Sequence, residues 1–413
     1  MKALRVLFIT RYNPWPPHGG ARIHNFNILQ ALNHCFDVDL LTVGPKEPIV
    51  DALCRRVIRV SPYYGDETAM LSARRWAAAG MASMLTKQPL WLSSKTHPAM
   101  RREGRRLAAV TDYAAIHASE LSSAVDLIDV TRAPLIYDAH NCEWSLLAKR
   151  ASEERFPAKS LVAREALALR RAEARVVSTA DAVLAVSDSD RDKLRDLAVE
   201  RPPIHVLPNM IDLDHYAVPR EAAPSPGMIL VPGKWDWRPN AIGLHWFCDE
   251  VVPRLRNVGN GPAPRVVVAG LMTPAMATRL NRIDGVTAIR NPPDMTPLFA
   301  EASVIAAPVL VSSGTRLRLI EAMASGRPAV TTGPGALGME GGAGSAWLQT
   351  DDAETFAHYL LNLMSDAELW RRVSETGWRF VQPYDWRASI DLLRAIYGAV
   401  TGTSSAVEEA RNQ

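Results

Sequence analysis

A loop of small residues followed by a helix that carries a carboxylate is the strongest chemical signal in this sequence. Ser313, Gly314 and Thr315 lie between an apolar run at 304–309 and a helical pattern. The first backbone N–H groups of a helix have no intrahelical partner, so such a loop can bind phosphate oxygens. Arg318 and Glu321 are three residues apart, which predicts that they share one helical face.

These residues together match what a nucleoside diphosphate needs. Backbone amides and Arg318 suit the phosphates, and the carboxylate of Glu321 suits the hydroxyls of a ribose. The alternative is an ordinary crossover helix with a surface salt bridge.

A second cationic loop follows the strand predicted at 228–231. It begins at Gly233, and Lys234 and Arg238 are suited to point and bidentate contacts with a diphosphate. Trp246 and Phe247 are predicted to pack in the core rather than to stack on a base.

The first strand leads into a glycine pair, Gly19 and Gly20, before a helical pattern. Glycine lets backbone amides approach a ligand closely, so the pair is a candidate ligand-binding loop. The alternative is a tight turn that packs the helix on the strand.

His140 is the candidate catalytic residue. It follows an apolar strand at 135–137 and is flanked by Asp138, Asn141 and Glu143. Ligands of parallel α/β sheets bind at the carboxyl ends of strands, which favours a role in chemistry. A histidine that only ties its loop to a neighbour is the structural alternative.

Two further motifs are rejected. The segment 333–338 has the GxGxxG spacing, but the glycine-rich residues after it cannot open a helix, so the anion-binding element of a dinucleotide site is missing. Asp212 and Asp214 form a triplet too common to establish a metal site. We therefore predict no metal and no cofactor.

Strand and helix patterns alternate along all 413 residues, which predicts α/β architecture with parallel sheets. The length exceeds that of one hydrophobic core, so two doubly wound domains are expected. The predicted bounds are 1–217 for an N-terminal domain, 218–227 for a proline-rich linker, 228–383 for a second domain, 384–400 for a C-terminal helix, and 401–413 for a disordered tail.

Composition excludes several classes. A net charge of +3 is too small to imply nucleic acid. Four scattered cysteines without a CxxC pair argue against a zinc site or a disulfide framework and fit a reducing cytosol. No apolar run approaches the length of a bilayer, so the protein is predicted to be cytoplasmic, with at most peripheral contact with an inner membrane.

The segment 70–110 is the candidate membrane contact. It carries eight cations against one acid, Glu103, with Trp76 and Trp91 interleaved. Such a segment can rest on an anionic leaflet, and a solvated helical surface is the alternative.

These motifs, in this order, resemble the retaining GT-B glycosyltransferases of the family, glycosyl transferases group 1, that builds bacterial lipopolysaccharide and exopolysaccharide. The resemblance runs from Gly19 and Gly20 through 138–140 and 207–209 to Gly233 and 321–328. It is closest to exopolysaccharide sugar transferases, which have Pro-Asn after the second-domain glycine and Gly-Thr-x-x-(Lys/Arg) before Glu-Ala.

The resemblance implies two Rossmann-like domains facing a central cleft, 1–217 for the acceptor and 228–383 for the nucleotide sugar, with the helix at 384–400 crossing back to the first domain. It also implies a hexosyltransferase that uses a UDP- or GDP-sugar, with Gly19, Gly20 and Gly233 in donor-binding loops. The acceptor would be a saccharide or a lipid-linked saccharide. Glu321 would bind the ribose, the amides of 313–315 the diphosphate, and His140 would lie beside the donor sugar. Ser313 stands where most of the family has a first glutamate, and Lys234 and Arg238 are the nearest substitutes for the usual Arg and Lys.

Glycosyl transfer passes through an oxocarbenium-like state while charge grows on the departing diphosphate. Lys234, Arg238 and Arg318 are expected to stabilise that leaving group. The family's proposed mechanism, in which the leaving phosphate helps to deprotonate the acceptor, needs no pair of catalytic carboxylates. The competing interpretations are a sugar-nucleotide epimerase and a non-catalytic sugar-nucleotide-binding relic.

Overall fold

The computed structural model describes residues 4–17, 19–60, 79–81, 83–85, 88–95, 97–129, 132–198, 202–216, 227–257, 263–311, 317–339 and 341–403. The chain divides into two compact units, unit 1 made of Met1–Met210 with Trp386–Gln413, and unit 2 made of Ile211–Asp385. Most of the predicted linker, the loop 312–316 and the end of the predicted tail lie outside the described residues.

Unit 1 is built on a parallel sheet of seven strands in the order β3-β2-β1-β4-β5-β6-β7. The strands are β1 (Arg5–Ile9), β2 (Asp37–Val43), β3 (Arg56–Val60), β4 (Ala115–Ser119), β5 (Leu135–Ala139), β6 (Ala182–Ala185) and β7 (Ile204–Val206). Each coincides, within one or two residues at its ends, with an apolar run that predicts a strand. The strand order reverses direction between β1 and β4.

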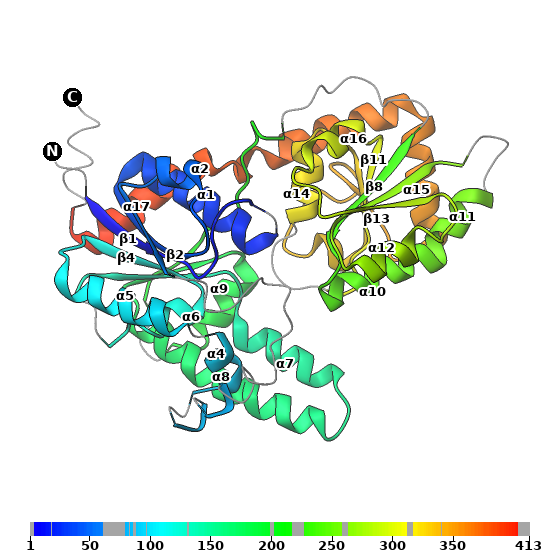
Figure 1. Cartoon of the computed structure of the whole chain (residues 1–413). Coiled ribbons are helices and arrows are strands. Elements are labelled where there is room, and N and C mark those ends of the chain that lie inside the picture. The colour runs from blue at the N-terminus through cyan, green and yellow to red at the C-terminus, as the bar shows by residue number, and fades with distance from the viewer. Residues whose placement is uncertain are drawn as a thin grey trace, which may run out of the picture. The chain divides into compact units, whose positions relative to one another are not determined.

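The helices of unit 1 cover both faces of this sheet. They are α1 (Gly20–Cys35), α2 (Pro48–Ala52), α4 (Leu90–Lys95), α5 (Pro98–Val110), α6 (Leu121–Ala124), α7 (Glu143–Glu153), α8 (Ala158–Thr179), α9 (Asp188–Arg195) and α17 (Ile390–Thr401), which follows a 3-10 turn at Trp386–Ser389. Figure 1 shows α1 and α17 on one face and α5 on the other.

Alternating side chains of β1 explain the two layers of core. Val6 and Phe8 pack with Leu393 and Ile396 of α17. The alternate side chains of the strand, Leu7 and Ile9, pack toward α5 and α8. Because successive side chains of a strand point to opposite faces, an apolar strand of this kind must be covered on both sides.

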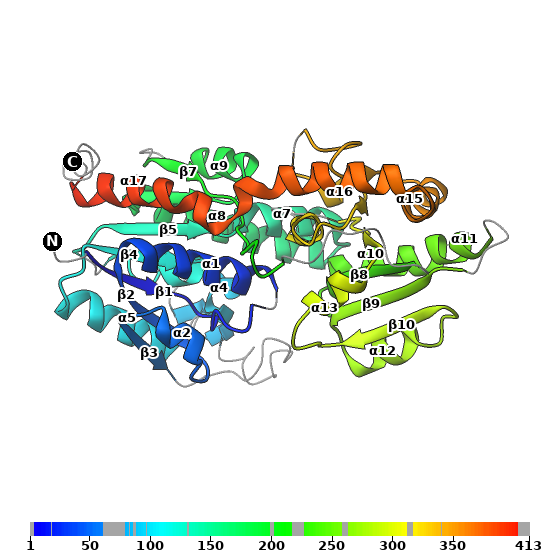
Figure 2. The ribbon, with the colours of Figure 1, turned by 90° about the horizontal axis from the view of Figure 1, so that it is seen from above.

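Unit 2 is built on a parallel sheet of six strands in the order β10-β9-β8-β11-β12-β13. The strands are β8 (Met228–Lys234), β9 (Arg265–Leu271), β10 (Val286–Arg290), β11 (Val304–Ala307), β12 (Ala329–Thr331) and β13 (Leu348–Gln349). In Figure 2, β8, β9 and β10 lie side by side. This order reverses between β8 and β11.

The helices of unit 2 are α10 (Arg238–Trp246), which continues as a π-helical turn at Phe247–Val251, α11 (Val252–Asn257), α12 (Pro274–Leu280), α13 (Thr296–Glu301), α14 (Leu317–Ala324), α15 (Ala353–Ser365) and α16 (Ala367–Val381), with 3-10 turns at Pro334–Ala336 and Gln382–Tyr384. Only three residues of the rejected GxGxxG segment are helical, as 3-10 turn. Among the described helices, none has the length and apolar character needed to cross a bilayer.

Candidate active site

Polar side chains gather in unit 1 at the point where the strand order reverses. Thr10 and Arg11 follow β1, Ser119 ends β4, and His140 follows β5. In parallel sheets this reversal point leaves a crevice at the carboxyl ends of the strands, where ligands bind. The topology therefore brings the predicted His140 to the expected position in unit 1.

The carboxylate of Asp138 is the centre of this group. Its Oδ2 lies 2.9 Å from His24 Nε2, 3.2 Å from His117 Nε2 and 3.6 Å from His140 Nε2. Only 1% of Asp138 is exposed. We call these four residues the Asp138 cluster. They come from α1, β4, β5 and the residue after β5, so the cluster joins two neighbouring strands to helix α1, and one of these strands, β4, lies at the reversal point.

The protonation states of the cluster follow from its geometry. Burial alone would raise the pKa of Asp138, but its electrostatic interaction with His24 and its contacts with His117 and His140 hold it well below its usual range. Burial, with the nearby charges of His140 and His117, lowers the pKa of His24 despite Asp138. Asp138 is therefore a carboxylate and His24 a neutral imidazole that donates through Nε2.

The back of the cluster reaches the last helix of the chain. The hydroxyl of Tyr397 on α17 lies 2.9 Å from His117 Nδ1. Burial raises the pKa of Tyr397 well above its usual value, so the hydroxyl keeps its proton. The other ring nitrogen of His117, Nε2, faces the Asp138 carboxylate, so His117 links α17 to the centre of the cluster.

His140 has a second set of partners in front of the cluster. Ser119 donates its one hydroxyl proton to Asn25 Oδ1 at 2.7 Å, so its oxygen accepts from His140 Nε2 at 3.0 Å. His140 Nδ1 lies 3.6 Å from Glu120 Oε1. Burial would lower the pKa of His140, but the hydrogen bond and charge of Asp138, with Glu120, raise it. His140 is thus held as a cation-prone imidazole, as a general acid or an electrostatic stabiliser requires.

The same residues could ligate a metal ion. Ligand atoms of His24, Asp138 and His140 lie within 4.8 Å of one another, and all three residues are buried. Two imidazoles and a carboxylate suit a transition metal. His24 donates to Asp138 Oδ2 at 2.9 Å, and a bound metal would replace this hydrogen bond. The absence of a metal stays a prediction.

Unit 2 places Glu321 and Arg318 together as predicted. Arg318 donates to Glu321 Oε2 at 2.6 Å within the first turns of α14. A partner that the sequence did not indicate, Tyr216, donates its hydroxyl to Glu321 Oε1 at 2.8 Å. Glu321 is only 2% exposed. Each carboxylate oxygen keeps a second lone pair, so the two contacts orient the carboxylate without saturating it.

The cationic loop of unit 2 follows β8. Lys234 ends that strand and is half-buried, and Arg238 begins α10 and is exposed. Asn240 holds the loop by donating to the carbonyl of Lys234 at 2.9 Å. Gly233 has a packing role, because a Cβ there would lie 2.4 Å from the ring of Trp235. Trp246 and Phe247 pack against Phe356, which confirms their predicted place in the core.

The two candidate loops of unit 2 follow neighbouring strands. β8 pairs with β11, so the loops after them leave the same sheet edge at the reversal point. Gly243 of α10 also packs directly on the residues after β11, because a Cβ there would lie 1.9 Å from the carbonyl oxygen of Pro308. The predicted phosphate-binding residues Ser313, Gly314 and Thr315 lie outside the described residues.

The glycine pair of unit 1 opens α1. Gly19 is the N-cap and has φ 94°, a left-handed backbone that favours glycine. Gly20 is the first helical residue and is exposed. Ile23, Phe26, Leu29 and Leu32 of the helix are buried, as their spacing predicts.

Sequence reasoning missed four of the polar residues that matter here. His24, His117 and Tyr397 meet only because α1, β4 and α17 pack together, and Tyr216 lies 105 residues before its partner. One local signal was available, since His117 interrupts the apolar run of β4 and a buried polar group must find a partner.

Two family models match the chain. Residues 18–215 match the model described as Glycosyltransferase Family 4, and residues 226–366 match the model described as Glycosyl transferases group 1. The two matches cover one domain each.

Solved structures with low sequence identity share the fold. Sucrose-phosphate synthase from Thermosynechococcus elongatus has a TM-score of 0.69 at 17% identity, over 97% of this chain and 100% of that one. HepE of Anabaena, crystallised with UDP and glucose, has a TM-score of 0.66 at 14% identity, over 96% and 100%. Trehalose 6-phosphate synthase from Burkholderia multivorans has 0.65 at 13%, over 98% and 100%.

The predicted GT-B fold is thereby confirmed, with two Rossmann-like α/β domains. No curated protein sequence matches the chain significantly.

Proposed function

We propose that this chain, a glycosyltransferase of the GT-B type, transfers a hexose with retention of configuration from a nucleoside-diphosphate sugar to a saccharide or lipid-linked saccharide in surface polysaccharide synthesis. HepE, which shares the fold, was crystallised with UDP-glucose, and this supports a nucleotide-sugar donor.

The observation that carries the donor assignment is the buried carboxylate of Glu321. A charged group with 2% exposure is expensive to bury unless it has partners. Arg318 and Tyr216 supply two, and the carboxylate keeps acceptor capacity for a ligand. Ribose hydroxyls would donate the remaining hydrogen bonds to this carboxylate.

The cations of unit 2 fit the chemistry of the leaving group. As the bond to the sugar breaks, negative charge collects on the diphosphate, and Lys234 and Arg238 beside the reversal point would stabilise it. Arg318 is partly neutralised by Glu321, so we assign it mainly to the orientation of that carboxylate. His140 would interact with the sugar at the carbon that reacts.

The protein is also proposed to bind a membrane peripherally. Within the predicted contact segment 70–110, Arg74, Arg75, Trp76 and Lys87 lie outside the described residues. Of the predicted basic segment, Arg101 and Arg106 pair with acids in their own unit, and Arg105 donates to the carbonyl of Asp126. Cations engaged in this way interact less with lipid.

The hairpin of α7 and α8 offers a second candidate membrane surface. Phe156, Leu161 and Leu167 are 83%, 63% and 62% exposed, and Lys159 and Arg164 are exposed among them. Exposed apolar side chains interleaved with cations suit the interface of an anionic bilayer. We propose that this surface brings the enzyme to a lipid-linked acceptor.

Calorimetric titration with UDP and GDP tests the donor assignment. Wild-type protein should bind one of them, and Glu321→Ala should weaken that binding by about 1–3 kcal/mol, the scale of a hydrogen bond to a charged group. The control is Glu375→Ala, which removes an exposed carboxylate paired with Arg371 in the same unit. Equal affinity in wild type and a folded Glu321→Ala variant would remove Glu321 from the donor site.

Incubation with the nucleotide sugar that binds then separates the enzyme classes. A transferase should release the nucleoside diphosphate and, with an acceptor, a product of the same anomeric configuration as the donor. An epimerase would interconvert nucleotide sugars without an acceptor, and a binding relic would leave the donor intact.

A further inference from the structure

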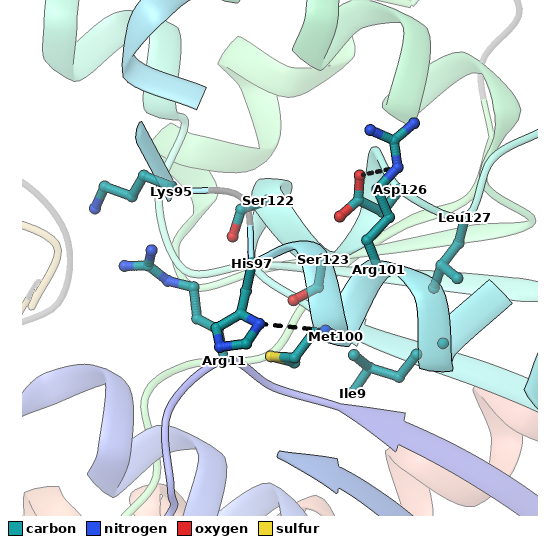
Figure 3. Close-up of a pocket in the computed structure, with 11 residues that line it drawn as sticks. Ile9, Arg11, Lys95, His97, Met100, Arg101, Ser122, Ser123, Asp126 and Leu127 are labelled. Carbon is teal, nitrogen blue, oxygen red and sulfur yellow. Dashed lines mark hydrogen bonds and ion pairs between the residues drawn. The ribbon is translucent and has the colours of Figure 1, made fainter. Parts of the chain in front are cut away.

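A small pocket in unit 1 opens beside the carboxyl end of β1. Its polar lining comes from four places in the sequence: Arg11 after β1, Lys95 and His97 around the start of α5, Arg101 on α5, and Ser122 and Ser123 on α6. Figure 3 shows these side chains together, with Lys95 and Arg11 on the same side of the pocket. We call it the Arg11 pocket.

The lining of the Arg11 pocket carries more positive than negative charge. Arg11, Lys95 and Arg101 face one carboxylate, that of Asp126, which lies 3.4 Å from Arg101 Nε. Arg11 donates to Glu120 at 2.8 Å, and Lys95 lies over the ring of Trp91 at 4.8 Å. Cations held beside one pocket attract an anion.

The same pocket contains a buried hydroxyl that could donate to an oxygen of a ligand. Ser122 is 6% exposed, and its Oγ has no hydrogen-bond partner among the described residues. A buried polar atom without a partner costs free energy, so such groups normally have one. The oxygen of a bound anion would accept from Ser122 and remove that cost.

The size of the pocket restricts what part of a ligand it holds. Its enclosed volume is about 20 Å³, close to that needed for one water molecule. A sugar ring does not fit, whereas one or two oxygens of a phosphate group do, with the rest of the ligand in the open mouth.

A single side chain, that of Glu120, connects the pocket to the candidate catalytic residue His140. Arg11 contacts Glu120, and Glu120 Oε1 lies 3.6 Å from His140 Nδ1. Lys95 and Arg11 also act on the buried carboxyl of Glu143: burial raises its pKa to about 7, and these two cations oppose the rise. A group bound in the pocket is therefore held near His140.

We propose that the Arg11 pocket binds a phosphate group of the acceptor, an inference that rests on the proposed function. The guanidinium groups offer bidentate contacts, Lys95 a point charge and Ser122 a hydroxyl donor, which together suit the several oxygens of a phosphate. The phosphate does not react. It anchors the acceptor so that a sugar hydroxyl nearby can reach the donor carbon.

The phosphate could belong to a sugar phosphate or to the diphosphate of a lipid carrier. The test begins with inorganic phosphate, titrated by calorimetry into protein saturated with the nucleoside diphosphate that it binds, so that the donor site is filled. Wild type should bind phosphate. Lys95→Gln and Ser122→Ala should each bind it about tenfold more weakly or worse, the loss of one charge-assisted or buried hydrogen bond.

Arg102→Gln is the matched control, because Arg102 is exposed on α5 outside the pocket. Competition then separates the two sources: glucose 6-phosphate represents a sugar phosphate and farnesyl diphosphate a lipid carrier. The compound that displaces phosphate at the lower concentration identifies the source. Phosphate affinity that is absent, or equal in Lys95→Gln, Ser122→Ala and Arg102→Gln, overturns the inference while nucleotide binding stays intact. Loss of nucleotide binding by wild type would instead refute the proposed function, and with it the acceptor role of the pocket.

Discussion

Replacement of Asp138 by asparagine tests the Asp138 cluster most directly. Asparagine keeps the shape of the side chain but removes the charge that orients three imidazoles, and its amide can place a donor where an acceptor is needed. Two of the three contacts, at 2.9 and 3.2 Å, are within hydrogen-bond distance. At about 1.5–3 kcal/mol for each bond to a charged group, their loss costs about 3–6 kcal/mol.

Mutations that break a buried charge network cost about 3–5 kcal/mol, which agrees with that sum. We therefore expect Asp138→Asn to lower the free energy of unfolding of unit 1 by about 3–5 kcal/mol near pH 6. The control is Asp129→Asn, whose carboxylate pairs with Arg175 at an exposed site and should cost less than about 1 kcal/mol.

The pH dependence of this difference has a definite sign. The pKa of Asp138 is lowered in the folded state from 3.8, so its contribution to stability is present above that pH and is lost as pH falls through the folded pKa. The pKa of His140 is raised from 6.5 by Asp138, so that part is present below pH 6.5 and is lost as pH rises through the folded pKa. The gap between wild type and Asp138→Asn should be largest between these limits.

Urea unfolding of the three proteins at several pH values from 4 to 8, followed by circular dichroism, measures the gap. A difference below about 1 kcal/mol at pH 6, or one equal to that of the Asp129→Asn control, would refute the view that the carboxylate holds the cluster together.

Three other outcomes are expected. His140→Ala should lower kcat and kcat/KM together by about two orders of magnitude with donor affinity unchanged, and near-wild-type turnover in steady-state kinetics would exclude a catalytic role. Gly233→Ala should lower the melting temperature, because its Cβ would meet the ring of Trp235, and an unchanged melting curve would show that the ring moves at no cost. Phe156→Ser with Leu161→Ser should release the protein from anionic vesicles in a sedimentation assay, whereas wild type that stays in the supernatant at low salt would contradict membrane contact.

The sequence predicts the fold well because its signals are local. Short apolar runs bounded by turns indicate strands whatever their neighbours, and the runs at 135–137, 228–231 and 304–309 correspond to β5, β8 and β11. The spacing of Arg318 and Glu321 is equally local, since three residues along a helix place two side chains on one face.

The candidate site is less predictable because its contacts are long-range. In the sequence Asp138 is only a near neighbour of His140, and nothing close to it shows that His24 and His117 converge on it. That convergence follows from the order of the strands and the packing of α1 on the sheet, which a single sequence does not reveal. The same holds for Tyr216, whose partner lies in a helix 105 residues further on.

The hydrogen bond between Tyr397 and His117 has a consequence for how the protein is made. The two residues are 280 positions apart, and all of unit 2 is translated between them. During synthesis, unit 1 must therefore wait with part of its core open until unit 2 has left the ribosome.

At about 5–20 residues per second, the 175 residues of unit 2 take roughly 10–35 s to translate, much longer than a small domain needs to fold. Unit 2 can thus fold first, as an insertion within the chain of unit 1. A fragment that stops at Met210 would lack the helix that covers Val6 and Phe8, and would expose apolar surface that in the complete chain lies against Leu393 and Ile396.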